Sequence, residues 1–305
     1  MKDINRASIR KRQVLQTQGK IMKNSTILIA IGKDAAVDEL AESFEAIRAL
    51  SAHAFILVID DMPNYPYYTV GAPSGGAAGV STGWIEERVT LAADLEAKAT
   101  DVRELLQRHN VSGEVSTVFR ESSMTAGATA RRAMLCDMAL INSDLRASAA
   151  LFRRVLHGIL FQSPVGVLLN DDAMSTLSGP KRIFVAWKAH LHSARAVHQA
   201  LPMLRRADEV VVGTIDPVMT ELRDGEDPGV DIAKWLTRHG CKVTVQQFPS
   251  GGQDIGDCIL DRSSEIGADL IVMGSYGHSR ARQAIFGGTT QSLIDQTEQA
   301  VFLAH

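Results

Sequence analysis

The chain has 305 residues, of which 45% are hydrophobic and 22% charged, and its formal net charge is −3. This composition is typical of a globular protein with room for two domains. The small negative charge speaks against a general nucleic-acid-binding surface, and no apolar run approaches the ~20 residues of a membrane-spanning helix. We therefore expect neither nucleic acid nor a membrane as a partner.

The N-terminus and the cysteines predict a cytoplasmic protein. The first residues are polar and basic and lack the apolar stretch of a secretory signal. Cys136, Cys241 and Cys258 are odd in number and have no CxxC spacing, which predicts reduced thiols rather than disulfides or a zinc site. Residues 1–21 are interpreted as an N-terminal extension, with Met22 as a candidate natural start.

One β-α-β unit occurs twice along the chain. Apolar, β-branched runs flank a stretch with helical periodicity, and the second copy repeats this order. Ile183 and Asp216 follow their counterparts Ile27 and Asp60 by 156 residues each. The predicted elements are strand 27–31, helix 40–50 and strand 55–60 in the first copy, and strand 183–187, helix 197–204 and strand 211–216 in the second.

Each copy then continues through a helix, a strand, a helix and an Asp-led apolar strand, and ends in a last helix and a short closing strand. In the first copy these are helix 84–109, strand 115–119, helix 125–135, the Asp-led strand 137–141 and the closing strand 165–169. In the second copy they are helix 230–239, strand 243–248, helix 255–266, the Asp-led strand 269–273 and the closing strand 301–304.

Strands that are apolar on both faces and alternate with helices predict a parallel sheet covered on both sides. We therefore predict two tandem, doubly wound, five-stranded α/β domains at 22–170 and 181–305, joined by a polar linker at 171–180. The Gly-, Pro- and Ser-rich stretch 62–83 has no counterpart of that length and is interpreted as a surface insertion.

The two closing strands also predict how the copies meet. Both are short and apolar, so they could pair across the two copies and remove exposed sheet edges. The expected partner of each domain is thus the other domain, with a homodimer and unidentified protein partners as further expectations.

The stretch 274–290 carries the strongest signal for a binding site. It leaves the end of the Asp-led strand, where ligands bind in α/β proteins. Gly274 and Gly277 allow a close approach of a ligand. The start of the next helix can hold phosphate through its main-chain N–H groups and dipole. The candidate residues here are Gly287, Gly288, Thr289 and Thr290, with nearby charge from His278, Arg280 and Arg282. The alternative is a glycine-rich loop that binds nothing.

This pattern resembles the phosphate loop of the universal stress protein family: Gly, two residues, Gly, nine residues, Gly, then Ser or Thr. Gly274, Gly277 and Gly287 match it, whereas Gly288 stands where the family has Ser or Thr. The resemblance covers both copies, from about Thr26 to His305. It implies a dimer-forming stress-response regulator, non-catalytic or nearly so, and ATP with Mg²⁺ as a ligand, which some members bind and others do not.

The nucleoside end of the predicted site departs from the family. ATP-binding relatives have an acidic residue directly after the first strand, whereas this chain has Trp187 and Lys188. Lys188 would meet a phosphate or another anion, or would be a solvated loop lysine. In the first copy the corresponding stretch is 142–158, where only Gly158 resembles the loop, so we interpret that site as degenerate.

Three functions stay open on the sequence. The first is a nucleotide- or phosphate-binding regulator, and the second is a ligand-free, dimerising interaction module. The third is an ATP-pyrophosphatase-like enzyme, suggested by Ser250-Gly-Gly-Gln-Asp254. That segment is also explained by Ser250 or Asp254 capping the next helix. His190 and His192 lie two apart and lack the helical spacing of a metal site.

Overall fold

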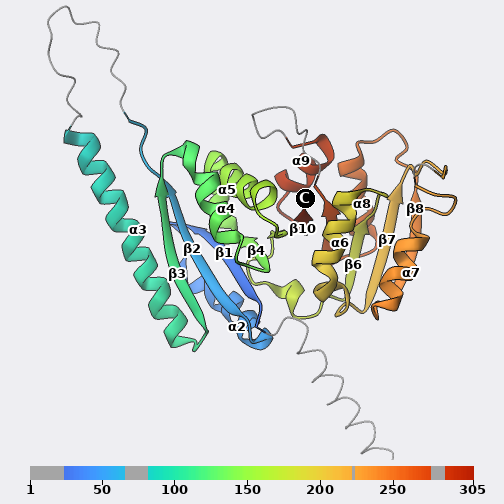
Figure 1. Cartoon of the computed structure of the whole chain (residues 1–305), viewed down its shortest axis with the longest axis horizontal. Helices are drawn as coiled ribbons and strands as arrows, with labels where there is room; N and C mark the ends of the chain where they lie inside the picture. The colour runs from blue at the N-terminus through green and yellow to red at the C-terminus, as the bar shows by residue number, and fades with distance from the viewer. Residues whose placement is uncertain (1–23, 66–81, 222–223, 276–285) are drawn as a thin grey trace, which may run out of the picture.

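The computed structural model describes residues 24–65, 82–221, 224–275 and 286–305, which form one ten-stranded sheet with helices on both faces (Figure 1). The strand order is β3-β2-β1-β4-β5-β10-β9-β6-β7-β8. The first five strands in the chain therefore build one side of the sheet and the last five build the other. This arrangement confirms the predicted α/β fold.

The elements of the first half run in the predicted order. They are β1 (Thr26–Gly32), η1 (Val37–Glu39), α2 (Leu40–Leu50), β2 (His53–Asp61), α3 (Thr82–Arg108), β3 (Gly113–Arg120), α4 (Ser122–Ala133), β4 (Met138–Ile141), η2 (Ser143–Ala147), α5 (Ala149–Gln162) and β5 (Val167–Leu169).

The second half repeats this order of strands and α-helices. Its elements are η3 (Ser175–Leu177), β6 (Arg182–Ala186), α6 (Leu191–Leu204), β7 (Glu209–Ile215), α7 (Val230–Arg238), β8 (Val243–Phe248), α8 (Ile255–Glu265), β9 (Leu270–Gly274), α9 (Gly288–Asp295) and β10 (Ala300–Ala304).

The central strands are buried on both faces because helices cover both sides. All residues of β4, β5 and β10 are buried, as expected for strands that are apolar throughout. Helices α2, α3, α6 and α7 contribute to the hydrophobic core on one face, and α4, α5, α8 and α9 contribute to the core on the other. Each core contains residues of both halves, so the halves share their interior.

The two halves meet where β5 pairs with β10. This pairing is antiparallel, with Phe302 opposite Leu168, whereas the other neighbouring strands in the sheet are parallel. Phe302 is only 1% exposed, and its ring lies against Gly166. Pairing of the two closing strands thus gives each half a neighbour at the edge where its own sheet would end.

The stretch predicted as a polar linker is a packed turn. The carboxylate of Asp171 accepts hydrogen bonds from the main-chain nitrogens of Ser175 (2.8 Å) and Thr176 (2.9 Å). Met174 and Leu177 are fully buried. The connection between β5 and β6 therefore contributes two side chains to the hydrophobic core.

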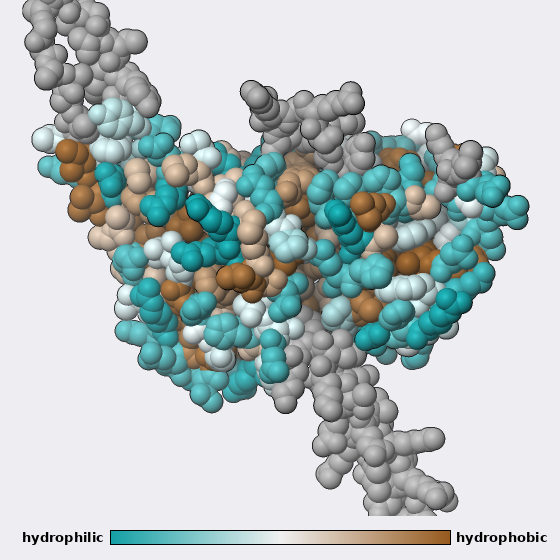
Figure 2. Space-filling model, viewed as in Figure 1, coloured by the Kyte–Doolittle hydropathy of each residue, from teal (hydrophilic) through white to brown (hydrophobic). Residues whose placement is uncertain are grey.

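Helix α3 extends beyond the sheet at its amino-terminal end (Figure 1). Its buried residues all lie from Leu95 onward, whereas Ile85 and Val89 are 47% and 63% exposed. Figure 2 shows apolar side chains at this end of the helix. The extension 1–21 and most of the predicted insertion lie outside the described residues. Within the described part of the chain, no helix combines the length and apolarity needed to cross a membrane.

Candidate functional site

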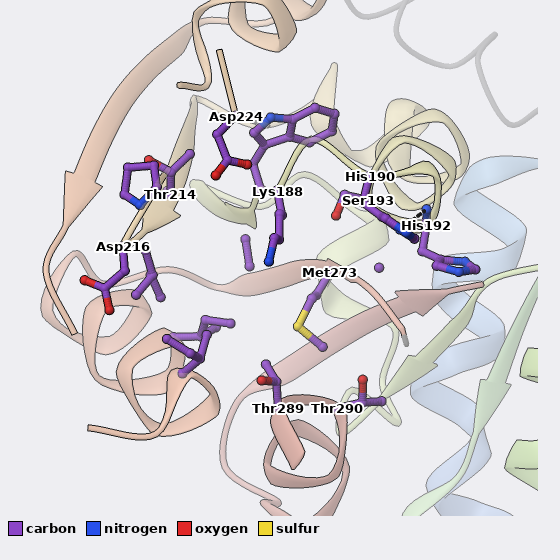
Figure 3. Close-up of a pocket in the computed structure, with 18 of the residues that line it drawn as sticks. Lys188, His190, His192, Ser193, Thr214, Asp216, Asp224, Met273, Thr289 and Thr290 are labelled. Atoms are coloured by element: carbon purple, nitrogen blue, oxygen red, sulfur yellow. Dashed lines mark hydrogen bonds between the residues drawn. The ribbon is translucent and has the colours of Figure 1, made fainter. Parts of the chain in front are cut away.

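A cavity of about 580 Å³ opens at the carboxyl ends of β6, β7 and β9 (Figure 3). The chain runs from β6 outward to β7 and β8 and then returns to the other side of β6 as β9. At such a switch point the loops after neighbouring strands diverge, which leaves a crevice for ligands in α/β proteins. The cavity therefore lies where the fold favours a binding site.

Trp187 and Lys188 follow β6 directly and line this cavity. Lys188 is exposed, and its side chain points into the cavity toward Met273 (Figure 3). Trp187 is half-buried beside it. The segment directly after β6 thus presents an ammonium group to the cavity.

The first turn of α9 forms another wall of the cavity. Thr289 and Thr290 line it, and Gly287 is the N-cap with φ −63° and ψ 153°. Any residue can adopt this φ, and a Cβ built on Gly288 would meet no atom within 4 Å. Gly288 is therefore not required by this packing, and its small size leaves the start of the helix open.

Gly274 also lines the cavity, but the close approach at this residue is made by the protein itself. A Cβ on Gly274 would overlap the main chain of His192 and Ser193 at the start of α6. The interpretation of Gly274 as a place for ligand approach thus has a simpler explanation in the packing of β9 on α6. Gly277 and His278 lie outside the described residues.

Two carboxylates in the cavity were not predicted from the sequence. Asp216 follows β7, and its carboxylate accepts a hydrogen bond from the main-chain nitrogen of Ser250 (2.9 Å). Hydrogen bonds from Ser250 lower the pKa of Asp216. Asp224 accepts a hydrogen bond from the main-chain nitrogen of Val218 (2.8 Å). Asp216 could have been found because it directly follows the strand next to β6, whereas nothing in the sequence pattern singles out Asp224.

The rest of the cavity wall is mostly apolar. Ile215, Pro217 and Ile259 line it, and Val218 and Ile255 are 41% and 36% exposed at its border. An apolar wall with a few placed polar groups is typical of small-molecule sites.

Thr214 adds a buried polar group to this wall. It is only 3% exposed, and its hydroxyl has no hydrogen-bond partner among the described residues. Buried hydroxyls nearly always have a hydrogen-bond partner, so Thr214 is an exception among the described residues.

Three histidines lie beside the cavity. The rings of His192 and His305 stack with their centroids 4.1 Å apart, and the centroids of His190 and His192 are 4.8 Å apart. Burial, together with the neighbouring His305, His190 and Arg195, lowers the pKa of His192 to about 4. This imidazole is therefore neutral near pH 7. No group of three or more possible metal ligands occurs in the described part of the chain.

Residues 179–305 match the model of the universal stress protein family. The C-terminal half of the chain is therefore similar to this family, and we call residues 179–305 the universal stress protein domain. A search of curated proteins finds no match. The universal stress protein domain contains the cavity with its lining residues.

One solved structure shows a likeness in fold over 92% of the chain. A universal stress protein from Archaeoglobus fulgidus is 15% identical with a TM-score of 0.58, and the match covers 92% of this chain and 97% of that one. A family member from Burkholderia pseudomallei is 20% identical (TM-score 0.30) over 40% of this chain and 94% of its own. Another A. fulgidus universal stress protein is 21% identical (TM-score 0.32) over 41% and 97%.

The equivalent position in the first half is occupied by the protein's own side chain. Gly32 ends β1, and its main-chain nitrogen donates to the carboxylate of Asp144 at 2.7 Å. Gly158, which resembles the family's loop glycine, lies where a Cβ would overlap the main chain of Ala126. It serves the packing of α4 on α5.

The segment that resembles an ATP-pyrophosphatase loop caps helix α8 of the universal stress protein domain. The Asp254 carboxylate accepts a hydrogen bond from the main-chain nitrogen of Gly256 (2.8 Å). The Ser250 hydroxyl accepts one from the main-chain nitrogen of Gly252 (3.2 Å). These contacts are those of a helix N-cap and a turn.

Proposed function

We propose that the universal stress protein domain binds a nucleotide, or another phosphate compound of similar size, and that the protein is a stress-response regulator with little or no turnover. One observation carries this proposal. A single cavity at the switch point of the sheet contains both the Lys188 ammonium group and the open start of α9. A lysine and a helix start are both suited to an anion.

ATP fits the described residues, with one change from the family pattern. The phosphates would be bound by Lys188, Thr289 and the main-chain N–H groups at the start of α9. Mg²⁺ would bind to the phosphates of the nucleotide. The apolar wall would hold the base. The Asp216 carboxylate lies in the same cavity and would accept hydrogen bonds from a ribose, in place of the acidic residue that relatives have after the first strand.

Two observations favour this proposal over the two alternative functions. The Lys188 ammonium group and the open start of α9 in one cavity favour a ligand over a ligand-free interaction module. The capping contacts of Asp254 favour binding over pyrophosphatase chemistry. A cytoplasmic location and homodimer formation belong to the same proposal, and the three buried, unpaired cysteines suit a reducing compartment.

A thermal-shift series with ATP, AMP and inorganic phosphate tests the proposal, combined with an assay for released AMP and pyrophosphate. We expect ATP to raise the unfolding temperature without product release, because a ligand that binds only the folded state stabilises it. No shift with any of the three would favour the ligand-free module. Product release that depends on Asp254 would favour the enzyme.

A further inference from the structure

Helix α9 joins the candidate site to the interface between the two halves. Its first turn lines the cavity through Thr289 and Thr290. Its last turn, at the opposite end of the helix, faces the first half of the chain. There a guanidinium nitrogen of Arg153 in α5 lies 3.8 Å from a carboxylate oxygen of Asp295. An eight-residue helix is too short to be stable by itself, so its position depends on contacts at both ends.

The first half supplies those contacts at the carboxyl end of α9 through Arg146. The Arg146 guanidinium donates to the main-chain oxygens of Ile294 (2.9 Å) and Gln296 (3.4 Å). A cation that binds the last carbonyl groups of a helix satisfies acceptors left without partners and complements the helix dipole. Arg146 thus acts as a C-terminal cap that is supplied from the other half.

Further contacts hold Arg146 in place. Its guanidinium also donates to the side-chain oxygen of Asn170 (2.7 Å) and lies 4.5 Å from the centroid of the Phe152 ring. The Asn170 amide in turn donates to the main-chain oxygens of Gln296 (3.0 Å) and Gln299 (3.1 Å). Two side chains of the first half therefore bind the segment directly after α9.

Arg146 lies in the segment of the first half that corresponds to the phosphate-loop segment of the second half. It lies in η2, which follows β4, just as the phosphate-loop segment of the second half follows β9. The first half does not carry the family's loop pattern at this place, and the same segment instead binds the carboxyl end of the helix that follows the loop of the second half.

We propose that Arg146 is a positioning residue for the candidate phosphate site, so that the first half sets the ligand affinity of the second. This inference rests on the proposed function for the identity of the ligand. The coupling is reciprocal: a ligand at the first turn of α9 tightens the interface at its last turn.

The test compares Arg146→Gln with Arg153→Gln in the full chain. Both changes remove an arginine at the carboxyl end of α9, but Arg153 makes a 3.8 Å ion pair in which both side chains are more than half exposed. We expect Arg146→Gln to raise the calorimetric Kd for ATP by at least about fivefold, the lower end of usual coupling between sites. Arg153→Gln should leave the Kd unchanged. Arg146→Lys, which keeps the charge, should have an intermediate effect and is available if the glutamine variant does not fold.

Hydrogen exchange without ligand separates this inference from the proposed function. Arg146→Gln should speed amide exchange along the whole of α9, including Thr289 and Thr290 at the cavity, more than Arg153→Gln does. If the wild-type protein binds no ATP, the proposed function fails and the exchange result alone decides the positioning role. Unchanged exchange in the first turn of α9, or an unchanged Kd in an otherwise ATP-binding protein, would overturn the inference.

Discussion

The carboxylate of Asp144 accepts a hydrogen bond from the main-chain nitrogen of Gly32 at 2.7 Å, where β1 ends. Lys188 follows Gly32 by 156 residues, the spacing of the internal repeat, and lines the cavity of the second half. The two halves thus differ at the same place. The first contains a fixed internal carboxylate and the second presents a cation, so an anionic ligand is expected in the second half alone.

The internal carboxylate predicts an unusual titration. Burial raises the pKa of Asp144 from its ordinary value of 3.8 to about 6, because its other oxygen is buried without a hydrogen-bond partner among the described residues. The folded state therefore binds this proton more tightly than the unfolded state. The contribution of Asp144 to stability is fully present below about pH 3.8 and is lost as the pH rises through 6.

NMR titration of the side-chain carboxyl of Asp144 checks this directly. Asp144→Asn keeps an oxygen that can accept from Gly32, and should remove this part of the pH dependence of unfolding. A carboxyl that titrates near the ordinary value would contradict the burial that we describe.

Lys188→Gln should weaken ATP binding about tenfold or more, since a hydrogen bond to a charged group contributes about 1.5–3 kcal/mol. The free energy of unfolding should change by less than about 0.5 kcal/mol because the side chain is exposed. Lys181→Gln is the matched control, because this exposed lysine lies just before the amino end of β6. Titration calorimetry measures both. Equal affinities in the two variants would exclude Lys188 from the site.

Gly288→Ala separates the effect on binding from the effect on folding. Its Cβ meets no atom within 4 Å, so the helix should gain up to about 1 kcal/mol of stability from the better helix former. A ligand phosphate close to the main chain of α9 would meet the added methyl group, and we expect about tenfold weaker ATP binding.

Gly83→Ala is the matched control. Gly83 lies in the first turn of α3, and its Cβ also meets nothing within 4 Å. This variant should gain similar stability without losing affinity. Tight ATP binding by Gly288→Ala would show that the phosphates do not approach this turn.

The contact between the halves predicts a coupled pair of mutations. A Cβ on Gly166 would overlap the Phe302 ring, so Gly166→Ala should destabilise the protein by about 1–3 kcal/mol. In a Phe302→Ala background the same change should cost clearly less, because the ring is gone. Urea unfolding of the four proteins in this cycle measures the coupling. Additive effects would mean that Gly166 and Phe302 do not interact.

Much of the fold could be predicted because its determinants are local. Apolar strands that alternate with helices, repeated at a spacing of 156 residues, indicate two doubly wound units. The apolar closing strands also suggested the pairing now seen between Leu168 and Phe302. The packed turn at Asp171 was less evident, because its polar composition hides the burial of Met174 and Leu177.

The candidate site could be predicted only in part, because its other members come from distant segments. Trp187, Lys188, Thr289 and Thr290 follow strand ends or start a helix, positions that a sequence reveals. Arg146 contacts a residue 148 positions away through side-chain geometry, which no local pattern encodes.

Glycines were a further limit on prediction. The sequence does not distinguish a glycine that serves a ligand from one that serves packing. The structure assigns Gly274 and Gly158 to packing, whereas Gly288 lies beside open space.

Titration calorimetry of ATP into the full-length protein, with and without Mg²⁺, tests the central claim most directly. Mass spectrometry under native conditions should first show whether a nucleotide has co-purified. The account predicts one ATP bound per chain, with affinity reduced in Lys188→Gln and unchanged in Lys181→Gln. No binding heat and no co-purified nucleotide would contradict it.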